Sequence, residues 1–231
     1  NSSGNSNEYM SAAEIGEIGQ NLYFAANAIG LGGVTTATIP PPMDRYVGLP
    51  EGEHGRIVFY LGHPAYSYDF IYRPMWFSLL PKIQTSSTSL TAAIVERKEA
   101  VTWDEIAMSK QLLVQMLWSS YGYSYLLDNT QDKYNILNIT RHRTLPSACG
   151  MYPLCIYAVT ETGTYRYYPN IVDTIYGLVN GWKSWPQITF LKKEITEDIR
   201  NDIAQVSEAY LATSPLIIIP VLDVEQTKQG G

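Results

Sequence analysis

The sequence predicts an α+β protein with a mixed, mainly antiparallel sheet flanked by helices. Residues 8–30 carry apolar side chains at three- and four-residue spacing, which is typical of a helix. Two short apolar runs, 154–160 and 164–168, are joined across Thr162-Gly163, which indicates a β-hairpin. The near-continuous apolar run 216–222 (LIIIPVL) indicates a central strand covered on both faces. We expect three or four strands in one sheet.

The first quarter of the chain predicts one long helix and a few short elements. Asn7 is the expected N-cap of the helix over 8–30, and Gly30 with the following glycines ends it. We then expect a loop or short extended piece over 35–42, a short helix over 44–49 and a strand over 56–61.

The remainder alternates helical and strand patterns after an aromatic-rich segment. Residues 65–87 predict an extended arm, suited to lying over a partner subunit. Ser109 is the expected N-cap of a helix over 109–120, with Gly122 beyond its end. Further helices are expected over 88–97, 171–181 and 194–212. Pro220 cannot donate a ladder hydrogen bond, so we expect it toward one end of the strand over 216–222.

Composition excludes several classes of function. The 231 residues are 45% hydrophobic and 16% charged, as in folded globular domains, and the net charge of −6 argues against nucleic acid as a partner. No apolar run is long enough to predict a membrane span. Cys149 and Cys155 cannot form a disulfide framework, so we expect a reducing, cytoplasmic location. The histidines show no metal-ligand spacing, and we expect no metal site.

The segment 141–157, RHRTLPSACGMYPLCIY, is the main candidate for a binding site. Small residues over 146–150 stand at the head of a predicted buried strand, where the backbone can approach a flat ligand. Arg143 precedes them. An ordinary tight turn into a core strand accounts for the same residues equally well.

Several motifs extend this candidate. The chain contains VERKEA, QMLWSSYG, RTLPSACGMYPLCIYAV and TYRYYP in that order within residues 88–169. Residues 14–64 contain EIGEIGQNLYFAANAIGLGG and YVGLPEGEHGRIVFYLGHP. The first set resembles the N-terminal half of the FMN-dependent nitroreductase family, most closely its SagB-type dehydrogenase branch. The second set resembles the C-terminal half of that family.

The two halves stand in reversed order. Residues 8–64 match the family's C-terminal half, and residues 88–222 match its N-terminal half. A circular permutation within one domain, residues 1–231, explains this order, because polar surface loops tolerate new chain ends. A slice through two tandem copies explains it as well.

The resemblance implies an FMN-dependent oxidoreductase with a nitroreductase-like fold. Such a protein passes hydride through flavin N5 between NAD(P)H or an organic donor and a small-molecule acceptor. The family is usually a homodimer. The alternative is a catalytically silent member, a binding or assembly module that has lost flavin.

The resemblance also assigns flavin-binding residues, although it identifies no catalytic residue. The ring would lie along the turn containing Pro146, Ser147, Ala148 and Gly150, with the Ser147 hydroxyl as a donor. Backbone N–H groups near flavin N5 would come from Gly33, Thr36 and Ala37.

The phosphate end departs from the family pattern. Arg97 and Lys98 match the basic pair that would bind the phosphate. Glu99 and Val101 stand where the family has a serine and a later arginine. Arg73 or Arg143 would have to compensate.

Overall fold

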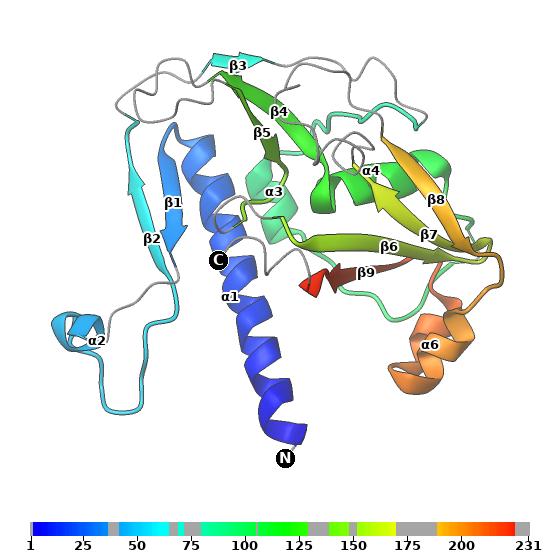
Figure 1. The fold of residues 1–231 in the computed structure, drawn as a ribbon, viewed down its shortest axis with the longest axis horizontal. Helices are drawn as coiled ribbons and strands as arrows, with labels where there is room; N and C mark the ends of the chain where they lie inside the picture. The colour runs from blue at the N-terminus through cyan, green and yellow to red at the C-terminus, as the bar shows by residue number, and fades with distance from the viewer. Residues whose placement is uncertain are drawn as a thin grey trace. The chain divides into compact units, whose positions relative to one another are not determined.

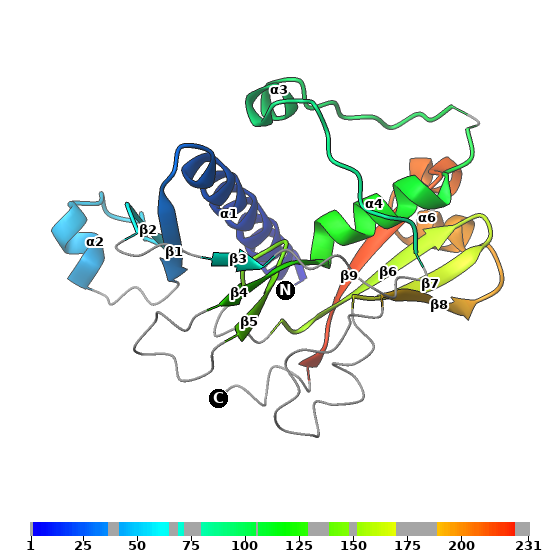
Figure 2. The same ribbon diagram turned by 90° about the horizontal axis from the view of Figure 1, so that it is seen from above.

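The computed structural model describes residues 2–36, 42–64, 69–71, 80–104, 106–128, 139–147, 152–169 and 189–224. The described residues form helices and three antiparallel sheets, which confirms the α+β class (Figures 1 and 2). The chain divides into two compact units. Unit 1 is Asn1–Ser67 with Thr88–Glu96, and unit 2 is Tyr68–Ser87 with Arg97–Gly231.

Unit 1 is built on the long helix α1 (Ser2–Ala28). The helix begins before Asn7, so the predicted N-cap is wrong. Its end matches the prediction, because Gly30 adopts a left-handed φ of 78° that ordinary side chains disfavour. The Leu31 N–H then donates to the Ala26 carbonyl at 2.9 Å, which satisfies a carbonyl that the helix end would otherwise expose.

A two-stranded sheet completes the main frame of unit 1. Strands β1 (Gly32–Thr36) and β2 (Val58–Gly62) pair antiparallel, and the helices α2 (Pro42–Val47) and α3 (Leu90–Val95) belong to the same unit. The Tyr23 hydroxyl of α1 accepts a hydrogen bond from the Thr35 N–H at 3.0 Å, which fixes β1 on the helix. The predicted strand over 56–61 and both short helices are confirmed within a few residues. The sequence did not separate β1 from a loop.

The centre of unit 2 is a four-stranded antiparallel sheet in the order β8-β7-β6-β9. Its members are β6 (Leu154–Thr160), β7 (Gly163–Tyr168), β8 (Phe190–Ile195) and β9 (Ile217–Leu222). Thr160 pairs with Gly163, so the hairpin turn is Glu161-Thr162, one residue earlier than predicted. Gly163 has a φ of 126°, which requires glycine at the start of β7.

Helix α4 (Lys110–Tyr121) covers one face of this sheet. As predicted, Ser109 is its N-cap, accepting from the Leu112 N–H at 3.2 Å, and Gly122 follows its last residue. Leu117, which is fully buried, packs with residues of β6 and β7. The core cluster comprises Leu80, Leu113, Val114, Leu117, Tyr121, Ile156, Ala158 and Tyr167.

Strand β9 differs from its prediction. It pairs with β6 and stands at the edge of the described sheet, with Leu222 54% exposed, so it is not a central strand covered on both faces. Pro220 lies inside the strand opposite Ile156 rather than at its end. An edge strand tolerates proline there because its outward N–H has no ladder partner to lose.

The predicted helix over 194–212 is wrong in its first part. Residues 190–195 form β8 against β7, and only α6 (Arg200–Val206) and the 3₁₀ helix η2 (Ala209–Thr213) are helical. Strand pairing therefore overrides the helical periodicity at this point. The helix predicted over 171–181 lies outside the described residues.

A separate three-stranded sheet was not predicted. It has the order β3-β4-β5, from β3 (Asp69–Ile71), β4 (Tyr123–Asp128) and β5 (Ile139–Arg143). The expectation of one mixed sheet is therefore wrong, because the described strands form three sheets and pair antiparallel throughout. Of the predicted extended arm, 69–71 is strand, 80–87 has no regular structure, and the rest lies outside the described residues.

Candidate functional site

Arg143, at the end of β5, lies among three tyrosine rings. Its guanidinium carbon is 4.3 Å from the ring centre of Tyr121, 4.7 Å from that of Tyr152 and 4.8 Å from that of Tyr123. Its Nη2 also approaches the Tyr123 hydroxyl at 3.4 Å. We call these four residues the tyrosine cage. Ring faces stabilise a cation that is partly removed from water, so the cage fixes a positive charge next to the candidate turn.

The cage is joined to the turn and to β6 by hydrogen bonds. The Tyr121 hydroxyl accepts from the Leu154 N–H at 3.1 Å, and burial raises the pKa of this phenol, so it stays neutral. The Ser147 Oγ accepts from the Tyr152 N–H at 2.9 Å. Tyr152 holds an unusual φ of 48° for a residue other than glycine. These two bonds therefore tie Ser147 to Tyr152 and the first residue of β6 to the last residue of α4.

The structure brings together two of the predicted flavin-binding residues. Arg143 and Ser147 both contact Tyr152, one through its ring and one through its N–H. Pro146 is exposed beside Ser147. Four further predicted residues lie outside the described residues: Ala37, Arg73, Ala148 and Gly150.

The predicted phosphate-binding pair occupies an exposed position. Arg97 Nη2 lies 2.9 Å from Glu99 Oε1, and these side chains are 72% and 80% exposed. Lys98 between them is exposed as well. The guanidinium proposed to bind phosphate is thus paired with the acid that replaces the family's serine. An ion pair this exposed adds little stability, so a ligand could displace it.

The remaining predicted residues, Gly33 and Thr36, belong to β1 in unit 1. A Cβ at Gly33 would lie 2.9 Å from side-chain carbons of both Leu61 and Phe59. The close packing of β1 against β2 therefore accounts for glycine there without any ligand. Thr36 is half-buried and pairs with Val58.

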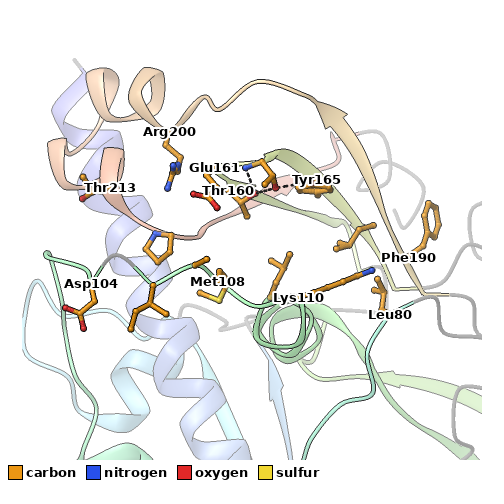
Figure 3. Close-up of a pocket in the computed structure, with 16 residues that line it drawn as sticks. Leu80, Asp104, Met108, Lys110, Thr160, Glu161, Tyr165, Phe190, Arg200 and Thr213 are labelled. Carbon is orange, nitrogen blue, oxygen red and sulfur yellow. Dashed lines mark hydrogen bonds between the residues drawn. The ribbon is translucent and has the colours of Figure 1, made fainter.

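Unit 2 also contains a cavity of about 720 Å³ that the sequence did not indicate (Figure 3). It borders Thr160 and Glu161, at the opposite end of β6 from the tyrosine cage. That strand spans about 20 Å, since a strand rises about 3.3 Å per residue. The lining residues come from separate segments of the chain: residues 80, 104, 106–108, 110, 113, 160–162, 165, 190–191, 200, 213 and 215. No local motif could have predicted this grouping.

Arg200 is the most firmly held polar side chain of the cavity. Its Nη2 lies 2.7 Å from Asp198 Oδ2, and its Nη1 donates to the Ser214 carbonyl at 2.9 Å. The bonds from Arg200 lower the pKa of Asp198, which keeps this carboxylate charged. On the cavity rim, the hydroxyls of Thr162 and Tyr165 lie 3.1 Å apart.

Cys155 lies on the sheet face away from α4 and receives a hydrogen bond from Arg166 Nη2 at 3.0 Å. Burial opposes the charge of Arg166, but its neighbours Cys155 and Tyr168 raise the pKa of the guanidinium overall. Among the described residues, no group of histidine, cysteine and acidic side chains is arranged to hold a metal ion. No helix in the described ranges combines the length and apolar character that crossing a bilayer requires.

Comparison with known proteins adds no family to these observations. Neither the family models nor the curated proteins contain a match to this chain.

Proposed function

We propose that this chain is an FMN-dependent oxidoreductase with a nitroreductase-like, circularly permuted fold. The supporting observation is the way its central motifs fold together. Helix α4 packs on β6, Ser147 accepts a hydrogen bond from Tyr152, and the ring of Tyr152 belongs to the tyrosine cage around Arg143. The reaction would transfer hydride between NAD(P)H or an organic donor and a small-molecule acceptor, the flavin ring supplying the redox chemistry.

The described residues fit the flavin ring better than its phosphate. The Ser147 oxygen already accepts the Tyr152 N–H, which leaves its own O–H able to donate to a ring atom. The positive charge of Arg143 would stabilise negative charge that develops on a flavin ring at the same end of β6. On the phosphate side Arg97 is paired with Glu99, and that arrangement does not fit an anion as it stands.

The Arg97–Glu99 pair specifically favours a second candidate function. A binding or assembly module that keeps the fold without flavin has no need of a free cation there. In that case the tyrosine cage would only stabilise the junction of α4 with β6.

Titration of the purified chain with FMN tests the proposal. We expect saturable binding, followed by visible flavin absorption that NAD(P)H or dithionite bleaches. Ser147→Ala should weaken FMN binding about fivefold, as expected for one lost hydrogen bond of about 1 kcal/mol. No uptake of FMN at any concentration would contradict the proposal and would favour the alternative, a binding or assembly module without flavin.

The variant Glu99→Ser tests the phosphate side separately. Removing this acid frees Arg97, so FMN should bind about three- to fivefold more tightly, in the range of an exposed ion pair. Glu53→Ser, at an exposed acid of unit 1, is the matched control and should leave FMN affinity unchanged.

The proposal includes a homodimer in the cytoplasm. Helix α1 exposes large apolar side chains, with Ile18 53% and Phe24 46% accessible, and such side chains are common at protein interfaces. Light scattering of the purified chain, with and without FMN, should show twice the 25.9 kDa mass of one chain. A monomer that still binds FMN would remove the dimer from the proposal.

A further inference from the structure

The cavity at the Thr160 end of β6 has the size of a small-molecule site. Its volume of about 720 Å³ lies within the range of about 300–1,000 Å³ common for ligand pockets. All its lining residues belong to unit 2. None of them belongs to the tyrosine cage or to the predicted flavin-binding set, so this site is separate from the proposed flavin function.

One end of the cavity is acidic. Figure 3 shows Glu161 beside Arg200, with Asp104 across the space from them and Thr213 at the same left-hand end of the view. The charge of Arg200 is already offset by its close bond to Asp198. The carboxylates of Glu161 and Asp104 are therefore in excess, and this end favours a cationic group or a donor such as an ammonium.

The other end is cationic. Lys110 is the first residue of α4, and its side chain extends toward Leu80 and Phe190 (Figure 3). Within the described part of the chain, no ion pair involves Lys110. The N-terminal end of α4 adds a partial positive charge of its own. A carboxylate is the simplest group to lie here.

The wall between the two ends is apolar. Leu80 and Leu113 are nearly buried, at 8% and 9% exposure, and Met108 and Leu191 pack against the same core cluster. These side chains are anchored in the core of the unit, so they offer a fixed apolar surface rather than one that collapses into the space.

We propose that this cavity binds a zwitterionic apolar amino acid or short peptide. The ligand's carboxylate lies at Lys110, its ammonium faces Glu161 and Asp104, and its apolar side chains contact Met108 and Leu191. The opposed charges at the two ends disfavour binding of the ligand in the reversed direction. The apolar wall selects against strongly polar side chains.

Calorimetric titration of the full chain with leucyl-phenylalanine tests the proposal. Two analogues separate the ends: N-acetyl-leucyl-phenylalanine lacks the ammonium, and leucyl-phenylalanine amide lacks the carboxylate. We expect the free dipeptide to bind saturably and each analogue to bind about fivefold more weakly, since a partly exposed charge pair contributes up to about 1 kcal/mol. Equal binding of all three peptides, or no saturable binding of the free one, would overturn the assignment.

Substitutions assign each end to its residue. Lys110→Gln should weaken the free and acetylated peptides about fivefold and leave the amide unaffected. Glu161→Gln should weaken the free peptide and the amide by a similar factor and leave the acetylated one unaffected. Lys82→Gln and Glu208→Gln, at exposed positions outside the cavity lining, are the matched controls and should change nothing.

A filled cavity provides the last arm of the experiment. Ala107→Trp places an indole in the space and should abolish binding, while circular dichroism confirms that the fold persists. Full affinity in this folded variant would show that the peptide binds elsewhere. FMN titration of the same samples should give the wild-type result, which keeps failure of this proposal distinguishable from failure of the flavin proposal.

Discussion

The two ends of strand β6 use polar side chains in opposite ways. At the Leu154 end, the Tyr121 hydroxyl and the Ser147 Oγ accept hydrogen bonds from the chain itself, and tyrosine rings surround Arg143. At the Thr160 end, Lys110 and Glu161 face a cavity. At the Leu154 end the polar groups stabilise the fold. At the Thr160 end they remain available to a ligand.

This difference between the two ends shows that recognisable sequence motifs and a cavity able to bind a ligand lie in different places. Two motif residues, Arg143 and Ser147, lie at the Leu154 end, where packing and hydrogen bonds within the chain already explain much of their arrangement. The cavity residues carry no motif, yet they meet the geometric requirements of a small-molecule site. If the two ends divide structure and binding in this way, substitutions at the Leu154 end should change stability and leave ligand binding at the Thr160 end unchanged.

The largest effect should come from Gly163→Ala at the cavity end. Gly163 has a φ of 126°, and a Cβ there would collide with the Ile195 carbonyl oxygen. Backbone strain together with this clash should cost about 3 kcal/mol of unfolding free energy, measured by urea denaturation. Gly16→Ala is the matched control: it meets no atom within 4 Å inside α1 and should stabilise by about 0.5–1 kcal/mol. Equal effects of the two variants would contradict the strain at Gly163.

Arg143→Met should give the next largest effect, at the tyrosine cage. Methionine keeps much of the apolar stem but removes the charge that lies over the rings. We expect a loss of about 2 kcal/mol in urea denaturation, the upper range for a partly desolvated cation–π site. Dipeptide binding at the far end of β6 should be unchanged. Unchanged stability would mean that the cage does not serve the fold.

Local patterns predicted the elements that hydrogen bonds within a segment define. Helix α4 with its Ser109 cap, the β6–β7 hairpin and the glycine that ends α1 were all found, because each is specified by adjacent residues. Residues 194 and 195 begin the predicted helix over 194–212 but belong to β8, which pairs with β7, so their structure depends on a distant partner. The edge position of β9 likewise follows from the sheet order, which periodicity does not encode.

The candidate site follows the same division. The sequence indicated Arg143 and Ser147 because the motif around them is continuous. It did not indicate the tyrosine rings as a cage, since Tyr121 and Tyr152 come together only when α4 packs on β6. The cavity was missed for the same physical reason: Lys110 and Glu161 are distant in sequence, and only the tertiary structure brings them to the same cavity.

Alkaline pH should destabilise the core between the two ends through Tyr167. Burial raises the pKa of Tyr167 above its ordinary value of 10.0, so the unfolded chain loses this proton first. Stability from this group is complete below pH 10 and declines above it, by up to about 1.4 kcal/mol per pH unit. Tyr167→Phe should reduce that slope in urea denaturation between pH 9 and 11, chosen as about one unit either side of an ordinary phenol pKa, and Tyr121, whose pKa burial also raises, should keep part of it. Tyr60→Phe, at a residue 52% exposed, is the control and should leave the slope in place.

The smallest effect on stability, and the sharpest contrast between the ends, should come from Asp198→Asn. The bonds from Arg200 lower the pKa of Asp198 below 3.8, so its contribution is complete above that pH and is lost as the pH falls through the lowered value. At neutral pH the variant should lose about 1 kcal/mol, typical of a partly exposed ion pair. The charge of Arg200 then becomes uncompensated, so the amide dipeptide should bind more weakly and the acetylated one more tightly. Asp44→Asn, which breaks a pair with His54 in unit 1, controls for stability alone. If both variants shift peptide binding equally, the acidic end of the cavity does not select the ligand.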